Sequence, residues 1–345
     1  MRTNPDPRAS KAAPGERAVI ERIRSRAGGK SSAGLALGIG DDCALLDPRP
    51  GEQIAVTTDL SIAGRHFLLD WHPAEVVGHR TLARGLSDLA AMGARPLAAF
   101  LSLGLPRDLT ERFQRRKSWL DRFFEGFLTL AKAQKTALAG GDLAESPIAV
   151  ADIVLVGAVP RGRALLRSGA RAGDLVYVTG TLGGAAAGLD RLGELAEKSV
   201  KGSGPPMAPK KMQASLASHL YPQPRIAQGL WLLRRRLASA AIDLSDGLST
   251  DLAHLCEESG VAAQIDASAL PIHRGATLDQ ALHGGEDYEL LFTAPAKTRI
   301  PGELAGVAVT QIGRVLPLRS GRAAITLITD GKKRSLRSQG WEHFS

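Results

Sequence analysis

Carboxylate side chains beside glycine and other small residues recur in five segments of this chain, at positions 38–42, 57–59, 87–88, 140–142 and 243–247. Each segment ends or borders an apolar run, where small residues allow the backbone to turn tightly. A single Asp beside Gly is most often a turn or a helix cap. Five such segments favour another interpretation, because Mg²⁺ prefers oxygen ligands and usually bridges carboxylates to substrate phosphates. The segments predict a phosphate site that holds several magnesium ions.

Asp88 lies near the small, apolar end of a predicted helix. Pro73 suits the first turn of that helix, which we expect to run to Met92 and to stop at Gly93. A buried carboxylate without a partner would cost several kcal/mol or take up a proton, so Asp88 needs a partner. A metal ion is the partner that we favour.

The first half of the chain predicts a sheet with helices against one face. The expected elements are a helix at 16–26, a strand at 54–59, the helix at 73–92, a strand at 97–105, an amphipathic helix from Leu109 to Ala131, a turn at 140–142 and a strand at 148–159. The β-branched run at 54–59 is typical of a buried strand and delivers Asp59 at its end. Helices and strands that alternate unevenly indicate an α+β arrangement.

The second half predicts a separate domain, entered through a polar, basic connection at 160–173. The expected elements are a strand at 174–179, a Gly/Ala-rich turn into a helix at 180–188, a mobile insertion at 195–215, helices near 226–237 and 250–259, a strand at 261–265 and a Gly-Gly turn before Glu286. The turn at 180–188 lacks the Gly-Lys-Ser/Thr ending of a phosphate loop, and tight packing of a helix on a sheet explains it equally well. We therefore expect a disordered tail at 1–15 and domains at 16–160 and 161–345.

The composition excludes several classes of protein. With 345 residues, 44% of them hydrophobic, the chain is long enough for two domains with their own cores. Its net charge of +9 resides largely in the first residues and in runs such as 234–236 and 332–334. These runs have no interleaved aromatic residues, so we expect solvated faces and no nucleic-acid partner.

The sequence also predicts a cytoplasmic protein. No stretch approaches about 18 consecutive apolar residues, and the first residues have no apolar core of a secretory signal, so we expect no membrane contact. Cys43 and Cys256 are too few for a disulfide framework. Both are expected to be small buried side chains in a reducing compartment.

Together the motifs resemble the thiamine-monophosphate kinase family, which belongs to the superfamily of aminoimidazole-ribonucleotide synthetase. The eight motifs that carry the resemblance, in the family's order, are Gly38-Ile-Gly-Asp-Asp42, Thr57-Thr-Asp59, Ala63-Gly-Arg-His66-Phe, Leu86-Ser-Asp-Leu-Ala-Ala-Met-Gly93, Gly140-Gly-Asp142, Ile242-Asp-Leu-Ser-Asp-Gly247, Gly284-Gly-Glu-Asp-Tyr-Glu289 and Gly340-Trp-Glu-His-Phe344. The resemblance runs in register from about residue 16 to the last residue. It implies an enzyme that makes thiamine diphosphate from thiamine monophosphate and ATP with Mg²⁺.

The resemblance implies a fold as well. It is an α+β, two-domain, synthetase-like fold, with an N-terminal mixed sheet that carries helices on one face and pairs in a homodimer. The C-terminal domain is implied to be an α/β sandwich.

Roles for single residues are also implied by the resemblance. The implied magnesium ligands are Asp42, Thr57, Thr58, Asp59, Asp88, Asp142, Asp243 and Asp246. The implied ATP contacts are Gly141, Arg167 and Ser245, and the implied thiamine-phosphate contacts are His66, Glu286 and Trp341. Three positions depart from the family's pattern: Leu60 and Leu143 stand where Thr is common, and Trp341 stands where many members have Tyr. None of these departures removes a ligand, although the lost hydroxyls can alter the surroundings of the metal ligands.

The chemistry of the implied reaction agrees with the residues. Because the acceptor is already a phosphate oxyanion, we expect no general base, and catalysis reduces to alignment and neutralisation of charge. Two polyanions repel one another unless cations lie between them, which explains a site rich in Asp. Arg167 can add a bidentate phosphate contact, and Trp341 can stack on a cationic thiazolium.

Several alternatives stay open at this point. Arg167 can be a solvated linker residue, His66 can cap or pack, and Trp341 can simply dock the end of the chain. The protein can be another ATP-dependent synthetase of the superfamily, or a nucleotide-binding protein without catalysis. The segment at 63–67 and Glu286 argue against the first, and the complete acidic set argues against the second.

Overall fold

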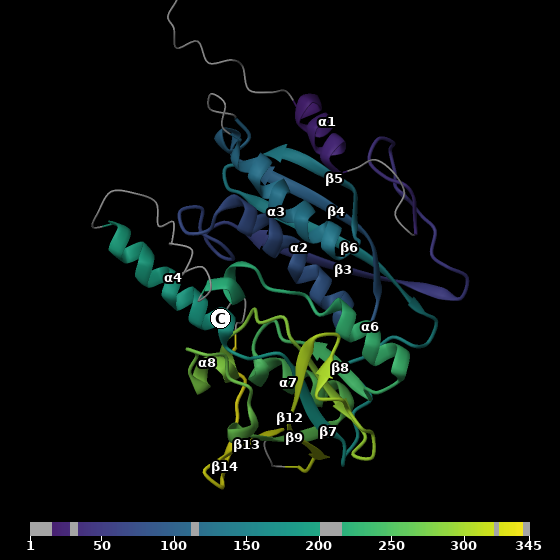
Figure 1. The fold of residues 1–345 in the computed structure, drawn as a ribbon, viewed down its shortest axis with the longest axis vertical. Helices are drawn as coiled ribbons and strands as arrows, with labels where there is room; N and C mark the ends of the chain where they lie inside the picture. The colour runs from purple at the N-terminus through teal and green to yellow at the C-terminus, as the bar shows by residue number, and fades with distance from the viewer. Residues whose placement is uncertain (1–15, 28–33, 112–116, 201–215, 321–323, 341–345) are drawn as a thin grey trace, which may run out of the picture.

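The computed structural model describes residues 16–27, 34–111, 117–200, 216–320 and 324–340. Figure 1 shows two layered parts, with the N-terminal part in purple and blue and the C-terminal part in green and yellow. Within the described ranges, no helix is both long and apolar enough to cross a membrane.

A four-stranded sheet forms the N-terminal part, in the order β3, β6, β4, β5. The strands are β3 (Glu52–Ile62), β6 (Val150–Pro160), β4 (Arg95–Leu105) and β5 (Ala137–Glu145), and the flanking elements are α1 (Glu16–Ala27), β1 (Leu35–Leu37), β2 (Leu45–Leu46), α2 (Ala74–Ala91), the 3₁₀ turn η1 (Arg107–Leu109) and α3 (Trp119–Ala133). Only β4 and β5 pair in parallel, and the other pairs are antiparallel. The sheet is therefore mixed, as expected.

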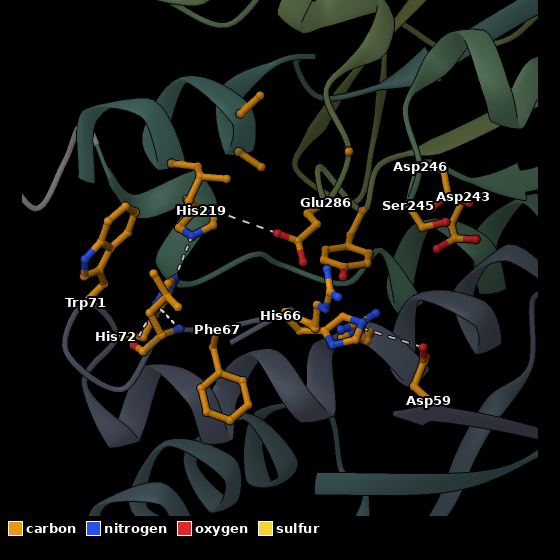
Figure 2. Close-up of a pocket in the computed structure, with 18 of the residues that line it drawn as sticks. Asp59, His66, Phe67, Trp71, His72, His219, Asp243, Ser245, Asp246 and Glu286 are labelled. Atoms are coloured by element: carbon orange, nitrogen blue, oxygen red, sulfur yellow. Dashed lines mark hydrogen bonds and ion pairs between the residues drawn. The ribbon is translucent and has the colours of Figure 1, made fainter. Parts of the chain in front are cut away.

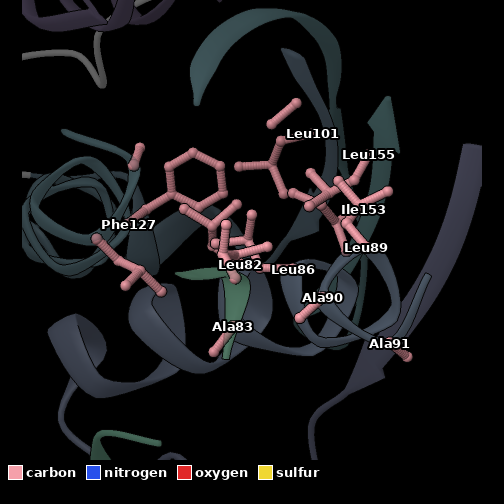
Figure 3. Packing of buried hydrophobic residues seen from close by; sticks show 14 of the residues in the cluster. Leu82, Ala83, Leu86, Leu89, Ala90, Ala91, Leu101, Phe127, Ile153 and Leu155 are labelled. Atoms are coloured by element: carbon pink, nitrogen blue, oxygen red, sulfur yellow. The ribbon is translucent and has the colours of Figure 1, made fainter. Parts of the chain in front are cut away.

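Helices α2 and α3 cover one face of this sheet. Figure 3 shows Leu82, Leu86 and Leu89 of α2 packed against sheet residues that include Leu155, with Phe127 of α3 alongside. The side chains that point away from the helices are exposed on β3 and include Ile54 at 42%, Val56 at 61% and Leu60 at 46%. One face of the sheet is thus a core. The other face has a smaller buried cluster that includes Leu35 and Val156, and it stays open to solvent along β3.

A second mixed sheet forms the C-terminal part, in the order β14, β13, β9, β12, β7, β10, β8, with β11 beside β12. Its strands are β7 (Leu175–Thr179), β8 (Ala240–Asp243), β9 (Val261–Asp266), β10 (Leu290–Ala294), β11 (Glu303–Leu304), β12 (Val307–Pro317), β13 (Ile325–Thr329) and β14 (Lys332–Ser335), and its helices are α4 (Gly184–Val200), α6 (Ile226–Arg235), α7 (Leu248–Ser259), the 3₁₀ turn η2 (Ala267–Ala269) and α8 (Leu278–His283). This arrangement confirms the expected fold class of two mixed α and β parts.

Helix α2 joins the two parts. It contacts β3 and β6 of the first sheet, and α6 and β8 of the second part. A Cβ at Gly229 of α6 would overlap the carbonyl oxygen of Ala90, so these helices touch backbone to backbone. Because α2 is covered from both sides, nearly all its side chains are buried, including Arg80 and Ser87. Polar groups on such a helix need partners inside the protein.

Three sequence predictions about local structure were wrong. Residues 140–142 lie inside β5 and form no turn. A Cβ at Gly141 would overlap the Leu101 carbonyl, so glycine at this position permits close pairing with β4. The amphipathic helix begins at Trp119, capped by Ser118, and Leu109 belongs to η1. The first residues of the expected insertion at 195–215 continue α4 as far as Val200.

Two predictions about burial were also wrong, one for a strand and one for a cysteine. The strand at 54–59, expected to be buried and to end at Asp59, is half exposed and continues to Ile62 as part of β3. Cys43 is exposed, whereas Cys256 is buried as expected. The predicted tail at 1–15 and the rest of the insertion, at 201–215, lie outside the described residues.

Candidate active site

Helix α2 presents three charged side chains at four-residue intervals, Arg80, Arg84 and Asp88, which therefore share one face of the helix. Asp88 accepts a hydrogen bond from the Thr57 hydroxyl of β3. Arg84 Nε lies 3.7 Å from Asp59 Oδ1. The polar face of α2 thus contacts β3, the edge strand of the first sheet.

A cavity of about 510 Å³ lies between the two parts of the chain. The predicted site residues that line it are Asp59, His66, Asp88, Asp243, Ser245, Asp246 and Glu286. Figure 2 shows the Asp243–Asp246 loop and Asp59 on one side, Trp71 and His72 on the other, and Glu286 between them. The structure therefore brings half of the predicted residues, from five separate motifs, to one cavity, which we call the acidic pocket.

A neighbouring cavity of about 420 Å³ shares Asp88 and Asp243 with the acidic pocket. Thr57 and Arg167 also line it. The positive charge of Arg167 acts on both shared carboxyls and opposes the rise of their pKa values. Arg167 thus lies beside the acidic cluster, with its side chain exposed.

Burial makes the carboxylates of the acidic pocket costly when they are ionised. It raises the pKa of Asp243 to about 7, and the charges of Asp88 and Asp59 add to the rise. The pKa of Asp59 is raised to about 6 by burial, against the pull of Arg84 and with the further push of Asp88. Such a cluster gains from any cation that enters it.

Glu286 is held as a carboxylate at the centre of the pocket. Burial by itself would raise its pKa, but Arg80 and His219 lower it to about 2. Arg80 Nη2 donates to both carboxylate oxygens, at 2.7 and 2.6 Å, and Nη1 donates to the His219 carbonyl. The backbone of Glu286 has a φ of 67°, in a region that non-glycine residues seldom adopt. The strained backbone and the Arg80 contact together fix this carboxylate.

The other end of the pocket is lined largely by apolar and aromatic groups. They are Phe67, Leu68, Trp71, Ala185, Ala186 and Leu189, with His72 and His219 at the border. The Nε2 atoms of the two histidines lie 3.0 Å apart. Burial lowers the pKa of His72 to about 4 and that of His219 as well, and the charge of Arg80 adds to both effects. Both rings are therefore neutral near pH 7, and this end suits an uncharged or cationic ring.

His66 lies on the loop after β3, at the edge of the pocket. Its Nδ1 accepts the backbone N–H of Ile62 at 3.0 Å. With Nδ1 as the acceptor, a neutral ring at this position carries its proton on Nε2.

Three predicted residues lie elsewhere in the chain. Asp42, Gly141 and Asp142 line a separate cavity of about 650 Å³ beside β5. The register Asp59–Ile153–Leu101–Gly141 crosses the whole sheet, so β3 and β5 are three strand spacings apart, roughly 14 Å. Within one chain, some predicted magnesium ligands therefore lie near the β3 edge of the first sheet and others near its β5 edge.

Thr58 is a predicted residue that does not line the pocket. The alternation of β3 places Thr58 on the open face, opposite Thr57. Trp341 lies outside the described residues.

Sequence reasoning missed several residues of the pocket. The missed lining residues are Trp71, His72, Arg84, His219 and Tyr288. Arg80 and Asp251 were missed as well, and they hold Glu286 and the backbone of Asp246 from behind the lining. The spacing of Arg80, Arg84 and Asp88 along one helix was a signal that could have found the two arginines. His219 had no such signal, since only folding brings it beside Glu286.

The donor atoms around the acidic pocket fit magnesium in type. Within the ranges that the structure describes, no three His, Cys, Asp or Glu side chains already converge as a metal site. Mg²⁺ does not require such a cage, because it usually keeps water and takes one or two carboxylates together with substrate phosphates. The acidic pocket offers oxygen atoms as ligands, and the raised pKa values of its carboxyl groups mean that added positive charge would be favourable there.

We expect the stability of the unliganded chain to fall as the pH rises from about 4 to about 8. Asp243 and Asp251 have pKa values of about 7 and about 8 in the folded chain, against 3.8 ordinarily, and burial is the main cause of both. Between the ordinary and the raised values the folded state holds protons that the unfolded state has lost, so stability falls across this range and levels off above about pH 8. Melting temperatures across this range test the sign. Asp251→Asn should flatten the slope, and an unchanged slope would contradict the assignment.

Comparisons with known proteins give the family. The model of the AIR synthase related protein N-terminal domain matches residues 40–160, and that of the C-terminal domain matches 171–325. The thiamine-monophosphate kinase of Escherichia coli K12 is 40% identical over 338 residues, which cover 94% of this chain and 96% of the relative.

Solved structures agree with the sequence relatives. A thiamine-monophosphate kinase from Stenotrophomonas maltophilia K279a matches with a TM-score of 0.77 and 39% identity, over 93% of this chain and 98% of that one. The structure described as AaThiL complexed with AMPPCP and TMP matches with a TM-score of 0.71 and 30% identity, over 96% and 97% of the two chains. The resemblance read from the eight motifs is confirmed, and the chain belongs to the thiamine-monophosphate kinase family of AIR synthase related proteins.

Proposed function

We propose that this enzyme transfers the γ-phosphoryl group of ATP directly to the phosphate of thiamine monophosphate, giving thiamine diphosphate and ADP. The observation that carries the proposal is the acidic pocket itself, which joins a carboxylate-rich end to an apolar, aromatic end with Glu286 between them. A phosphorylated ring compound needs both environments at once. A relative of the same fold that was solved with AMPPCP and TMP supports this choice of ligands.

The proposed reaction requires no proton to be removed from the acceptor. A bond forms between an acceptor phosphate oxygen and the γ-phosphorus, and the bond from that phosphorus to the β–γ bridging oxygen breaks, so that ADP leaves with the electron pair. The chain's task is then to align the two phosphates and to offset their repulsion. The two histidines beside Trp71 are paired with each other, and their lowered pKa values make them weak proton acceptors.

Mg²⁺ ions would supply the positive charge that two polyanions and this carboxylate cluster need. In the acidic pocket, Asp59, Asp88, Asp243 and Asp246 would hold them. Thr57 hydrogen-bonds to Asp88 and orients that carboxylate. Arg167, beside Asp88 and Asp243, would add a fixed charge for a nucleotide phosphate, and Ser245 of the acidic pocket would add a second ATP contact.

The acceptor would occupy the other end of the pocket. Glu286, fixed as a carboxylate by Arg80, suits the amino group or the positive charge of the thiamine rings. The proton on His66 Nε2 suits a phosphate oxygen. We keep Trp341 as a proposed ring contact, on the family resemblance alone.

A homodimer through the open face of the first sheet is also part of the proposal. Ile54, Val56 and Leu60 form an exposed apolar row there, and such a surface favours a partner. A two-fold axis along the strands would set the β5 edge of the partner over the β3 edge of this chain. That pairing would bring a second Asp42 and Asp142 toward Asp59, so it would reunite the divided ligand set.

We expect the enzyme to phosphorylate thiamine monophosphate and not free thiamine. The pocket offers metal-binding carboxylates for an anionic acceptor, and no base for a hydroxyl. Incubation with ATP and Mg²⁺, followed by separation of the thiamine esters, checks this, and removal of Mg²⁺ with a chelator should stop the reaction. Comparable turnover of free thiamine would show the proposal to be wrong.

Asp88→Asn should lower kcat by about a hundredfold or more while the melting temperature stays close to that of the wild type. The amide keeps the shape and an acceptor for Thr57 but loses the charge that the metal needs. Asp108→Asn, in the exposed turn η1, is the matched control and should behave as wild type. An active Asp88→Asn enzyme with normal Mg²⁺ dependence would remove Asp88 from the metal set.

Val56→Asp should convert the dimer into a monomer and reduce activity, because a charge would replace the most exposed apolar residue of the sheet face. Leu318→Asp, at a side chain that is 54% exposed in the C-terminal part, is the control and should stay dimeric. Sedimentation velocity at micromolar concentration measures both. A wild-type chain that is monomeric and fully active would refute the dimer and the shared ligand set.

A further inference from the structure

Residues 338–340, which we call the docked segment, lie against the first turn of α7. Ser338 Oγ is 2.7 Å from Thr250 Oγ1, and the same Thr250 oxygen accepts the N–H of Gly340 at 3.1 Å. The N–H of Gln339 points to Ser249 Oγ at 3.4 Å. Ser249 and Thr250 are both buried. Two buried hydroxyls of α7 therefore hold three consecutive residues that belong to no helix or strand.

Gly340 touches the loop that carries Ser245 and Asp246. A Cβ at position 340 would overlap the carbonyl oxygen of Asp246 and would lie 2.6 Å from Thr250 Oγ1. The φ of Gly340 is outside the left-handed region, so space and not backbone conformation requires glycine here. Any larger residue must displace either the docked segment or the Asp246 backbone.

The loop that carries Ser245 and Asp246 also packs closely against the turn that carries Glu286. A Cβ at Gly285 would lie 2.6 Å from the Ser245 carbonyl oxygen, and one at Gly247 would lie 2.8 Å from the His283 oxygen. The N–H of Glu286 donates to the Ser245 carbonyl at 2.8 Å. The loop is thus held between the turn that carries Glu286 and the docked segment.

Asp251 holds the same loop through two backbone hydrogen bonds. One of its carboxyl oxygens accepts the N–H groups of Asp246 and Gly247, at 3.1 and 3.0 Å. Asp251 and Thr250 are adjacent on α7, so the same helical turn grips both the loop and the docked segment. A shift of one is transmitted to the other through backbone contacts.

We infer that the docked segment is a positioning element of the active site, in which Thr250 and Gly340 set where Ser245 and Asp246 stand in the acidic pocket. The inference rests on the proposed roles of Ser245 toward ATP and Asp246 toward Mg²⁺. It adds a reciprocal coupling: binding of Mg²⁺ and ATP stabilises the docked segment, and docking strengthens their binding by the same factor.

Limited proteolysis tests the coupling without measuring catalysis. Trypsin cleaves after Arg337, which is exposed and directly precedes the docked segment. Mg²⁺ with ATP should slow this cleavage about fivefold or more, while cleavage after the exposed Arg319 serves as the internal control. Gly340→Ala and Thr250→Val should speed cleavage after Arg337 in the absence of ligand, and Thr250→Ser should restore the wild-type rate. Equal rates with and without ligand, or in wild type and both variants, would overturn the inference.

The Mg²⁺ dependence of the reaction separates positioning from simple support. Gly340→Ala should raise the Mg²⁺ concentration for half-maximal rate about fivefold or more, with little change in melting temperature. Gly302→Ala is the matched control, because a Cβ there meets nothing within 4 Å. A lower melting temperature with unchanged Mg²⁺ dependence would show that the segment only supports the fold. A wild-type chain that does not phosphorylate thiamine monophosphate would refute the proposed function, and the proteolysis rates would still decide the coupling.

Discussion

The burial of α2 between the two parts of the chain is the interaction on which the structure depends. Its apolar side chains, such as Leu82 and Leu86, complete the core against the first sheet, and its far side meets α6 and β8. A helix in that position cannot leave charges unpartnered. Arg80, Arg84 and Asp88 therefore find partners in both parts, and the acidic pocket forms where they do. The same packing that stabilises the fold thereby brings the metal-binding and ring-binding ends together.

Electrostatics explains why the pocket is built for ligands. Burial raises the pKa values of Asp59, Asp88 and Asp243, and the charge of Asp88 adds to the rise at the other two. The ionised form of this cluster is therefore unfavourable without added positive charge. Glu286 is the opposite case, because Arg80 holds it ionised. Cations and phosphates relieve the first group, while the second is ready for a substrate ring. One pocket thus combines carboxylates that need added positive charge with an ionised carboxylate, Glu286, whose charge is balanced by Arg80.

Glycines at backbone contacts tie these groups to one another. Gly285 and Gly340 both lie in close contact with the Ser245–Asp246 loop. Gly229 allows the backbones of α6 and α2 to approach closely. Each contact leaves no room for a Cβ, so close approach of backbones helps to position these segments.

The sequence by itself determined the acidic segments, the α2 helix that ends before Gly93, most strand positions and the family. Those features follow from local residue types and spacing, which one chain carries in full. Only the tertiary structure decided which distant segments meet. It placed Gly141 in a strand and not in a turn, and it sent Asp142 to a different edge from Asp59. It also brought His219 beside Glu286, because strand pairing and burial depend on contacts between residues far apart in sequence.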